Sequence, residues 1–443
     1  MYRPEDIEKI EKHIDRIKND VAREYRMNYE PTLNEITKVY NVIINYLKEN
    51  KKIVYGGFAQ NMLIKNKNPK DSFYKEIDGV FYNWPDVADI EFYSTDPIED
   101  VVKLTEKLYT HKFKHIIGKE GVHPETYKIF VNLINYCDIS YMNPNIYDNL
   151  PIINVDGILC CEPHFMMCDA YRVMTDPLTS YWRLDKSINR FQKIIKYYPL
   201  DMSLLDKKYE FKSLLNIIKI IRKQILHNSK LIIIGFYAFN YYAKKSMKKY
   251  VIKDVSYYEA ISTNFDKDKI EILKKLNHYF DSKITVKEFY PFFMFFDKRI
   301  EFYYDGNLIF KLYGNNERCI VYKHSEKKHC YFGTYNLVFM YLLFNYYYFI
   351  IYKDIFNINL FKSFLSKLYY IRNNYLNKRN ITVIDTSPFQ DFTFKCLGIP
   401  LDPLRSSLIN NNNNDKKLFI YKPSENIKKL DSINFINTSG SQI

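Results

Sequence analysis

No Cys-x-x-Cys pair occurs among the seven cysteines of this sequence, and their number is odd. Both features argue against a disulfide framework and favour a reduced, intracellular compartment. His324, His329 and Cys330 lie close together in the sequence but lack a second cysteine pair, so we expect no zinc site there. The N-terminus carries no apolar core, and we therefore expect no signal peptide.

Long hydrophobic runs are also scarce, with one exception at residues 335–352. That run is long enough to be a candidate membrane span. Asn336 and Asn345 interrupt it, however, and its middle is filled by tyrosines, which prefer membrane interfaces to the bilayer centre. We therefore expect a buried helix here, and no membrane partner.

Basic charge, in contrast, is abundant. The chain contains 65 Lys and Arg against 51 Asp and Glu, a formal net charge of +14. This balance favours a polyanionic partner, either nucleic acid or an anionic membrane surface. Aromatic residues make up 17% of the chain, and although such rings can stack on bases we expect most of them in the core. A length of 443 residues allows two or three domains with packed cores.

The spacing of apolar residues predicts an α/β (α+β) protein of short strands and amphipathic helices. Helices are predicted at residues 5–26, 32–49, 58–65, 97–109, 163–174, 186–197 and 208–227. Strands are predicted at residues 51–55, 89–93, 127–133 and 135–142, which together form a small mixed sheet, and residues 66–82 are predicted to be a loop. The asparagine-rich stretch from Asn410 predicts a low-complexity, partly flexible tail.

Three acidic residues are the candidates for catalysis. Asp89 and Glu91 are two positions apart on a predicted strand, so they project from the same face about 6.5–7 Å apart. Asp138 lies inside a second apolar run and can complete the set from a neighbouring strand. Three such carboxylates suit a pair of divalent metal ions. Asp86 is a competing acid, but its spacing from Asp89 places it on the opposite face.

A glycine turn precedes these acids. Gly56 and Gly57 lead into a helix N-terminus, where free amides and the helix dipole favour a phosphate. Lys186, Arg190 and Lys193 on a later helix are within possible reach of a phosphate, although a solvated helix face is the alternative for each of them. An isolated acid pair or glycine pair is commonly structural, whereas their occurrence together in this order favours a catalytic site.

The chain then repeats this pattern. Pairing Gly56 with Gly235 also pairs Ala59 with Ala238 and Asn61 with Asn240, and each glycine follows a predicted long helix. The segment 91–108 aligns without a gap with 259–276. We therefore expect an internal duplication, in which the strand at 299–303 takes the place of 136–140 and the helix at 335–352 that of 162–174.

The second copy differs where the chemistry would occur. Phe236 stands in place of Gly57, and Tyr257 in place of Asp89. Loss of a carboxylate and of a glycine at the turn predicts that this copy is catalytically inactive. It would then serve as a structural or RNA-contacting relative of the first copy.

The order Gly56-Gly57, Asp89-x-Glu91 and Asp138 resembles the DNA polymerase β-type nucleotidyltransferase superfamily. With the altered second copy, the length and the composition, the chain resembles the poly(A) polymerase catalytic subunits of large DNA viruses, those of giant amoebal viruses more than those of poxviruses. Two departures are Glu91, where poxviral relatives have Asp, and a Gly-Gly turn where many members have Gly-Ser.

This resemblance implies a set of roles. Asp89 and Glu91 would hold two Mg²⁺ or Mn²⁺ ions, and Asp138 the ion at the RNA 3′-hydroxyl. ATP is the implied substrate, and the residues assigned to nucleotide binding are Gly56, Gly57, Ser94, Lys186 and Arg190. The implied assembly is a homodimer, located in the host cytoplasm at the viral factory, with packaging in the virion as a further option.

The function expected from these observations is template-independent addition of AMP from ATP to RNA 3′ ends. Two alternatives stay open: a terminal transferase that prefers another nucleotide, and a non-catalytic RNA-binding or processivity subunit. The expected domains are an N-terminal helical segment (1–50), a catalytic domain (51–200), a degenerate copy (205–400) and the tail (401–443).

Overall fold

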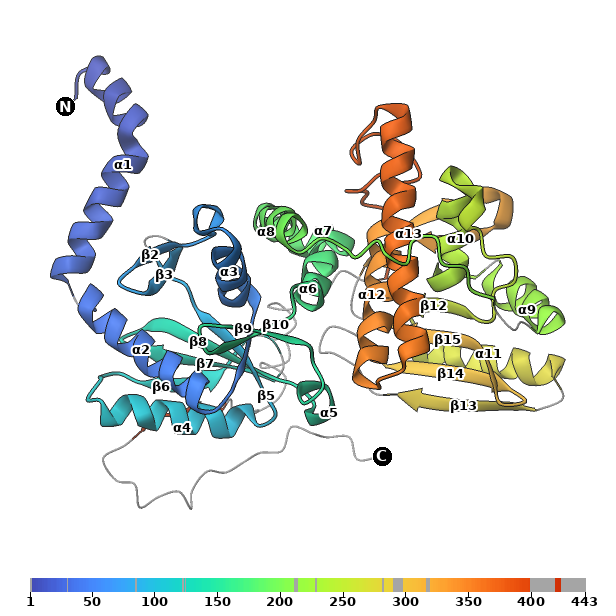
Figure 1. Cartoon of the computed structure of the whole chain (residues 1–443), viewed down its shortest axis with the longest axis horizontal. Helices are drawn as coiled ribbons and strands as arrows, with labels where there is room; N and C mark the ends of the chain where they lie inside the picture. Colours follow the sequence, from blue (N-terminus) through green and yellow to red (C-terminus); the bar gives the residue numbers. More distant parts are fainter. Residues whose placement is uncertain are drawn as a thin grey trace. The chain divides into compact units, whose positions relative to one another are not determined.

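The computed structural model describes residues 2–423, except for 30, 84–85, 122, 124, 211–213, 228, 281–282, 290–297, 316–318 and 399–418. The chain forms two compact units: residues 1–162 with the segment from 403 onward, and residues 163–402 (Figure 1). Each unit is built on one mixed sheet flanked by helices, which confirms the predicted fold class. Most of the predicted tail, 401–443, lies outside the described residues.

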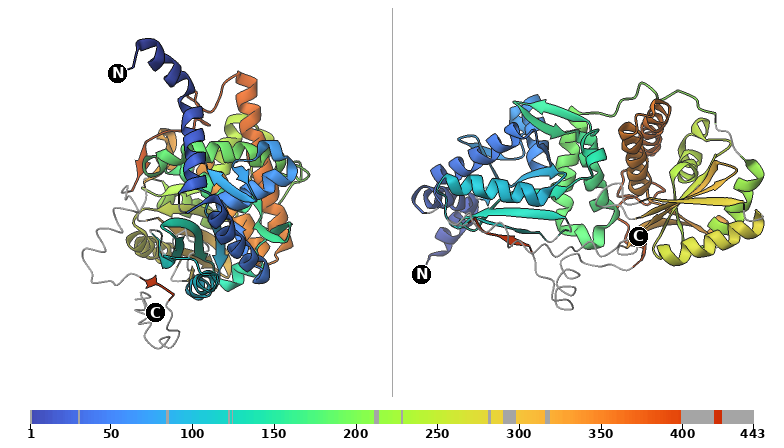
Figure 2. Two further views of the ribbon diagram at one scale, coloured as in Figure 1. Left: turned by 90° about the vertical axis from the view of Figure 1, so that its left-hand side faces the viewer. Right: turned by 90° about the horizontal axis from the view of Figure 1, so that it is seen from below.

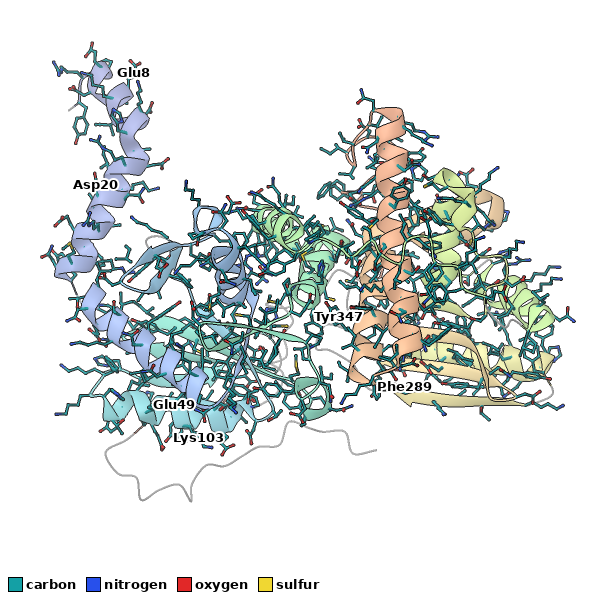
Figure 3. The ribbon with its side chains drawn as sticks, viewed as in Figure 1. Glu8, Asp20, Glu49, Lys103, Phe289 and Tyr347 are labelled. Atoms are coloured by element: carbon teal, nitrogen blue, oxygen red, sulfur yellow. A yellow bond between two sulfur atoms is a disulfide. The ribbon has the colours of Figure 1, made fainter. Side chains whose placement is uncertain are left out.

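The first unit begins with the two predicted helices, α1 (Pro4–Asn28) and α2 (Leu33–Glu49). Thr32 caps α2 by accepting a hydrogen bond from the Glu35 amide at 3.3 Å, and one apolar face of α2 is buried. No described residue of α1 is buried, and its side chains stand out into solvent in Figure 3, where Glu8 and Asp20 mark it.

The first sheet has the strand order β19-β6-β7-β8-β5-β1-β10-β9. β5 is parallel to β8 and antiparallel to β1, and β1 is parallel to β10. Helix α3 (Gly56–Lys67) follows β1 directly, while α2 and α4 (Pro97–Thr110) lie side by side along the sheet. The strands are β1 (Ile53–Tyr55), β5 (Ile90–Ser94), β6 (Ile117–Glu120), β7 (Thr126–Val131), β8 (Ile134–Tyr141), β9 (Ile152–Val155), β10 (Ile158–Cys161) and β19 (Ile420–Tyr421).

The C-terminal strand β19 completes one edge of this sheet. It pairs antiparallel with β6, and the Tyr421 hydroxyl donates a hydrogen bond to the Glu106 carboxylate at 2.7 Å. The ring of Phe419 lies 5.5 Å from that of Tyr127 in an edge-to-face arrangement. Residues from opposite ends of the sequence therefore share one sheet.

The predicted loop at 66–82 was wrong. This segment forms a 3₁₀ turn (Pro69–Asp71) and the strands β2 (Lys75–Ile77) and β3 (Val80–Asn83), which pair in a small sheet with β4 (Asp86–Val87). The segment is anchored on α3, since the Asn61 side chain accepts hydrogen bonds from the Phe73 and Tyr74 amides. These contacts to a preceding helix leave no periodic signal in the sequence.

The second sheet has the order β13-β14-β15-β12-β11-β17-β16-β18. Apart from one added edge strand in each, β19 and β18, this is the order of the first sheet, and the parallel and antiparallel pairings match as well. The duplication is therefore confirmed. The strands are β11 (Ile232–Ile234), β12 (Tyr258–Ser262), β13 (Ile284–Phe289), β14 (Arg299–Tyr304), β15 (Asn307–Gly314), β16 (Ile320–Ser325), β17 (Cys330–Gly333) and β18 (Cys396–Leu397).

One predicted correspondence within the duplication was wrong. β14, which holds residues 299–303, takes the place of β7, and it is β15 that takes the place of β8. The two strands form a hairpin of similar apolar segments, and the sequence gives no marker for which of them pairs with the central strand. The error matters because the residue of the second copy that is equivalent to Asp138 then lies on β15 and not on β14.

The predicted helix at 208–227 was too long. Residues 208–210 and Leu214 are not helical; α9 spans Leu215–Ile221 and continues as a π-helical turn, Arg222–Leu226. The preceding segment instead packs on α13 (Ile355–Arg379), where the Lys367 ammonium donates a hydrogen bond to the Lys207 carbonyl at 2.5 Å. α11 (Phe265–Tyr279) lies along the second sheet (Figure 2), and α10 (Gly235–Ser246) follows β11 as α3 follows β1.

Helix α12 (Tyr335–Ile351) confirms the buried helix expected from the long apolar run. It packs between α13 and α6 (Pro163–Thr175), with the Tyr347 ring edge-on to Phe165 at 5.1 Å. Within the described ranges, none of the helices has the length and apolarity needed to cross a membrane.

α6 and the following α8 (Leu184–Tyr197) belong to the second compact unit. In chain order they follow the first sheet as α12 and α13 follow the second. Their assignment to a catalytic domain at 51–200 stays a prediction.

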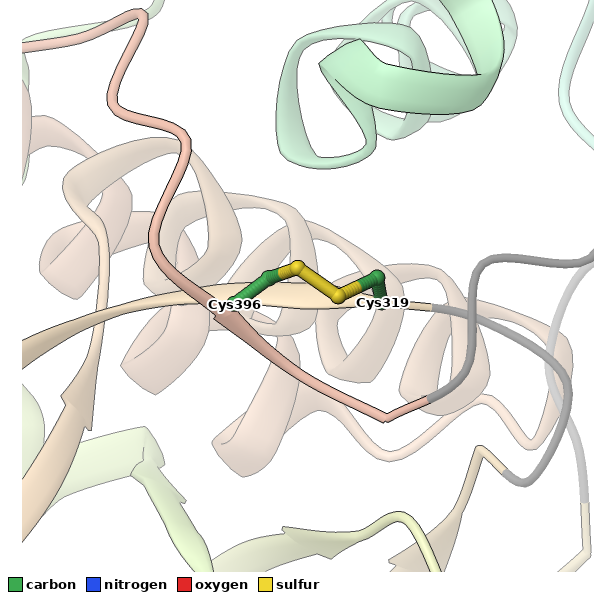
Figure 4. Close-up of a disulfide and its surroundings, with 2 residues drawn as sticks. All are labelled: Cys319 and Cys396. Atoms are coloured by element: carbon green, nitrogen blue, oxygen red, sulfur yellow. A yellow bond between two sulfur atoms is a disulfide. The ribbon is translucent and has the colours of Figure 1, made fainter.

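A disulfide joins Cys319, next to β16, to Cys396 on β18 (Figure 4). This pair was not predicted, because its two cysteines are 77 positions apart in the sequence and are brought together by the pairing of β18 with β16. The five other cysteines are buried and free, so the chain has one bridge and no framework of bridges among its described residues.

Candidate active site

Four neighbouring strands of the first sheet place polar side chains in one row. Lys128 on β7 is in register with Asp138 on β8, Asp138 with Glu91 on β5, and Glu91 with Tyr55 on β1. Residues in register on adjacent strands project from the same face, about 5 Å apart. Asp138 was predicted to lie on a strand next to that of Glu91, and the register of β5 and β8 confirms this placement.

Asp138 is held by two neighbours. The Lys128 ammonium lies 2.5 Å from its Oδ2, and the Asn135 amide donates to its Oδ1 at 2.9 Å. The two charged side chains are 27% and 16% exposed. The Asp138 carboxylate is therefore held in one orientation by an ion pair and a hydrogen bond.

Glu91 lies at the N-terminus of α3. Its Oε2 accepts a hydrogen bond from the Gly57 amide at 2.5 Å. Gly56 has φ +66°, and a Cβ at this position would lie 1.9 Å from Glu91 Oε2. The glycine turn thus makes room for the carboxylate of Glu91, and the Gly57 amide predicted to face a phosphate donates to that carboxylate.

Asp89 directly precedes β5 and lies on the Glu91 side of that strand by alternation. Burial, with the nearby negative charges of Asp138 and Asp89, raises the pKa of the Cys137 thiol. Cys137 is fully buried beneath the row and is adjacent to both acids. The three predicted carboxylates therefore lie around the start of β5, where Glu91 is in register with Asp138 in the middle of β8.

The other predicted residues lie elsewhere. Ser94 is fully buried and accepts a hydrogen bond from the Asp96 amide at 3.0 Å; Ser262 makes the equivalent bond to Asn264 at 2.9 Å. That bond accounts for the serine in both copies, and a role in nucleotide binding stays a prediction. Lys186 and Arg190 lie on α8, in the second compact unit. The competing acid, Asp86, is exposed on β4, outside the main sheet.

Three residues in or beside the row had not been predicted. Lys128 and Asn135 hold Asp138, and the Tyr55 ring stacks on Tyr93 at 4.0 Å while its hydroxyl is 2.6 Å from Ser140 Oγ. Lys128 could have been found from the sequence, because it faces Asp138 across the predicted hairpin of β7 and β8.

The donor set suits a hard divalent cation, since it consists of carboxylate oxygens on adjacent positions of one sheet. As the side chains stand, the described part of the chain contains no group of three His, Cys, Asp or Glu positioned as metal ligands. Asp138 is directed to Lys128, and Glu91 to the Gly57 amide. The carboxylates fit such ions in their chemistry and in their positions on the strands. For Asp138 to bind a metal ion, the Lys128 ammonium would have to move away from its Oδ2.

The second sheet carries an altered version of this row. Glu259 on β12 is in register with Lys311 on β15, and Lys311 with Glu301 on β14. Lys311 thus replaces Asp138, and Glu301 replaces Lys128, so the two charges have exchanged strands. The Lys311 ammonium lies 3.6 Å from a carboxylate oxygen of each glutamate, with its side chain only 4% exposed.

Aromatic rings fill the remaining space of the second site. The Phe236 ring lies 5.6 Å from that of Tyr257, and the Lys311 ammonium is 5.0 Å from the centre of the Tyr257 ring. Glu259 is fully buried, and burial raises the pKa of its carboxyl group. The space of the second site is therefore filled by its own side chains, and its catalytic inactivity stays a prediction.

Gly235 and Glu259 are retained together in this copy. Gly235 has φ +60°, and a Cβ there would lie 1.9 Å from Glu259 Oε2, as at Gly56 and Glu91. The first glycine of the turn and the glutamate are thus a packing pair common to both sheets. The positions that differ are the second glycine and the two aspartates.

Two copies of one mixed sheet, of which only the first carries all three carboxylates, are the arrangement of a nucleotidyltransferase with an altered second copy. Residues 41–180 match the family model described as poly(A) polymerase catalytic subunit. Residues 192–443 match the model of the C-terminal part of the corresponding APMV subunit.

Individual proteins agree with these family matches. A protein of Acanthamoeba polyphaga mimivirus named a poly(A) polymerase catalytic subunit is 30% identical over 94% of this chain and 78% of its own length. The crystal structure of the Megavirus polyadenylate synthase matches with a TM-score of 0.87 at 28% identity, covering 96% of this chain and 86% of that one. A subunit of the same name from African swine fever virus is 25% identical over 40% of this chain and 37% of its own length.

The chain belongs to the poly(A) polymerase catalytic subunits of large DNA viruses and is a polynucleotide adenylyltransferase.

Proposed function

We propose that this enzyme adds AMP from ATP to RNA 3′ ends without a template and releases pyrophosphate. Asp89, Glu91 and Asp138 would hold two Mg²⁺ or Mn²⁺ ions. When bound, such ions lower the pKa of an attacking hydroxyl and stabilise the leaving pyrophosphate. The observation that carries the proposal is the register pairing of Glu91 with Asp138 in a row whose second copy has lost the acid.

The residues around the carboxylates orient them. The Gly57 amide fixes one oxygen of Glu91, and Gly56 gives that carboxylate the space it occupies. Lys128 and Asn135 hold the Asp138 carboxylate in place. Gly56, Gly57, Ser94, Lys186 and Arg190 are the proposed contacts to the nucleotide.

The test incubates the purified protein with a short RNA, Mg²⁺ or Mn²⁺, and each nucleoside triphosphate separately. Extension with ATP alone, abolished by Asp89→Ala, is the expected result. Extension with UTP instead would show a terminal transferase of another preference. RNA binding without extension by any nucleotide would leave a non-catalytic RNA-binding subunit as the correct description.

We further propose a homodimer, located in the host cytoplasm at the viral factory, with packaging in the virion as an alternative location. Helix α1 supports the dimer. Its apolar residues recur at alternating spacings of three and four, and Ile7, Ile14, Ile17 and Val21 are 47%, 42%, 39% and 63% exposed. Such a stripe is typical of a helix that pairs with another helix.

Charge favours an antiparallel pair of α1 helices. In that arrangement Glu11 lies opposite Lys18 of the partner subunit, twice per dimer. A parallel pair would place Asp6 beside Glu11 of the partner subunit. Light scattering of the full chain should show a dimer that Ile14→Asp with Ile17→Asp converts to a monomer, whereas Lys12→Asp with Asn19→Asp, on the other face, should not. A dimer unaffected by the first pair would exclude α1 as the interface.

A further inference from the structure

A group of basic side chains gathers at one corner of the second unit. They come from three elements: the π-helical turn after α9, the last turn of α10, and the loop between β16 and β17. We call this group the cationic corner; its members are Arg222, His227, Lys244, Lys245, Lys328 and His329.

Aromatic side chains hold the corner together. The Lys328 ammonium lies 3.4 Å from the Tyr237 hydroxyl and 5.4 Å from the centre of the Phe332 ring. Phe332 stacks on Tyr241 at 4.7 Å, and the Lys245 ammonium lies 5.8 Å from the Tyr241 ring. Lys245 of α10 and Lys328 of the β16–β17 loop therefore pack against two stacked rings, those of Tyr241 and Phe332.

Within the described part of the chain, no carboxylate forms an ion pair with the lysines and the arginine of the corner. Among the described residues, none of Arg222, Lys244, Lys245 and Lys328 forms an ion pair. Glu326 lies in the same loop, but its carboxylate makes no ion pair with them either. His227 Nε2 is buried and has no hydrogen-bond partner in the described part of the chain.

Gathering cations in this way costs stability. Burial, together with the charges of Lys244, Arg222 and Lys245, lowers the pKa of the Lys328 ammonium. The pKa of His227 is lowered in the same way, by burial and by Arg222, Lys328 and His329. A bound anion would relieve both effects, and unrelieved charge of one sign is characteristic of binding surfaces.

The first copy shows that the fold does not require this charge. Its corresponding loop is Asp156-Gly157, which has no lysine. Lys65, at the α3 position that matches Lys244 on α10, lies 2.5 Å from the Glu76 carboxylate. At the matching helix position the lysine is thus paired with a carboxylate in the first copy, and it makes no ion pair with a described residue in the second.

We propose that the cationic corner binds the phosphate backbone of single-stranded RNA. This inference rests on the proposed function, because the RNA being extended is the polyanion that the reaction requires. Phosphate contacts by lysine and arginine are independent of base sequence, which suits an enzyme whose product grows without a template. The degenerate copy would then contribute to the enzyme by holding RNA.

The test measures binding of a short fluorescein-labelled single-stranded RNA by anisotropy, over a range of salt concentrations. The variant combines Lys244→Gln, Lys245→Gln and Lys328→Met. Each phosphate contact contributes about 0.7 to the slope of log affinity against log salt, so losing three should lower the slope by about 2. Affinity at physiological salt should fall about tenfold or more.

A matched control removes the same charge from lysines that are already paired, through Lys267→Gln, Lys269→Gln and Lys362→Gln. The control should keep the salt slope of the unchanged protein. Melting curves of both variants establish that they are folded. A corner variant that binds RNA with the original affinity and slope would overturn the inference.

Two further outcomes separate the possible failures. If the corner variant loses binding to polyglutamate but not to RNA, the surface recognises an acidic polypeptide and the RNA assignment is wrong. If the unchanged protein binds RNA through the corner but extends it with no nucleotide, the proposed function fails while this inference stands.

Discussion

The two sheets of this enzyme share strand order and pairing direction, yet they use the same row of positions in opposite ways. In the first, Lys128 and Asp138 leave the row partly open at 27% and 16% exposure. In the second, Glu301, Lys311 and Glu259 are 8%, 4% and 1% exposed under aromatic rings. The same row of positions thus holds a partly exposed ion pair in one sheet and a buried charge network in the other, with no difference in fold.

The comparison shows which positions of the turn and the row have a structural role in both sheets. The glycine that begins each turn and the glutamate it accommodates occur in both sheets, because a side chain on the glycine would collide with the glutamate. Asp89 and Asp138 occur in one sheet only. The glycine and the glutamate therefore have a packing role common to both sheets, and the proposed chemistry needs, in addition, the two aspartates that only the first sheet carries.

Substitution of the matched glutamates should give the largest difference between the copies. Glu91→Gln should lower the rate of AMP addition by about 10²–10³-fold, since it removes one of the charges that we propose to hold the metal ions. Glu259→Gln should leave the rate unchanged, because that carboxyl group is fully buried in the other sheet. Initial rates on a labelled RNA at saturating ATP provide the measurement, and equal losses in both variants would mean that the second sheet takes part in catalysis.

Removal of the lysine from each row should have the larger effect in the second sheet, and the quantity affected is the stability of each unit. Lys311→Met leaves Glu259 buried without a cation and should cost about 3–5 kcal/mol in the second unit. Lys128→Met breaks a pair that solvent reaches, and should cost the first unit about 1 kcal/mol. Hydrogen exchange of amides in β12 and β15, compared with β5 and β8, reports each unit separately. Similar losses in both sheets would contradict the contrast in burial.

The smallest effect concerns the cationic corner and depends on pH. The pKa of Lys328 is lower in the folded chain than its usual 10.5, so the unfolded chain holds more protons between those two values. Stability therefore rises with pH across that window, and the cost of burying the charge is fully present below it. Lys328→Met should raise the melting temperature at neutral pH. The gain in the free energy of unfolding should be less than about 1 kcal/mol, because the side chain is partly exposed, and it should shrink as pH approaches 10.5.

The corresponding change in the first copy, Lys65→Met, should not raise the melting temperature, because Lys65 is paired with Glu76. A higher melting temperature in both variants would indicate that the change results from burial of the apolar part of the lysine side chain and not from removal of an unneutralised charge.

Much of this architecture follows from local sequence. Helical spacing located α1, α2, α4 and α8 within a few residues, and the comparison of residues 56–61 with 235–240 identified the duplication. These signals are local because one turn or one strand is enough to generate them.

The errors concern long-range pairing. The segment 66–82 folds because it contacts α3, and Lys311 became recognisable as the counterpart of Asp138 only from the strand order. The Lys128–Asp138 pair was within reach of sequence reasoning, whereas the Cys319–Cys396 bridge was not. Hairpin partners can be inferred from alternation, but pairing across 77 positions cannot.

The edge strand β19 has a consequence for the synthesis of this protein. Its pairing with β6 means that the first sheet receives its outermost strand from residues 420 and 421, after the whole second unit has been translated. Until then, the β6 edge of a nascent chain has no β19 to pair with. On a translating ribosome, the sheet that begins first is therefore completed last, and a chain truncated before Phe419 would present an open strand edge to its neighbours.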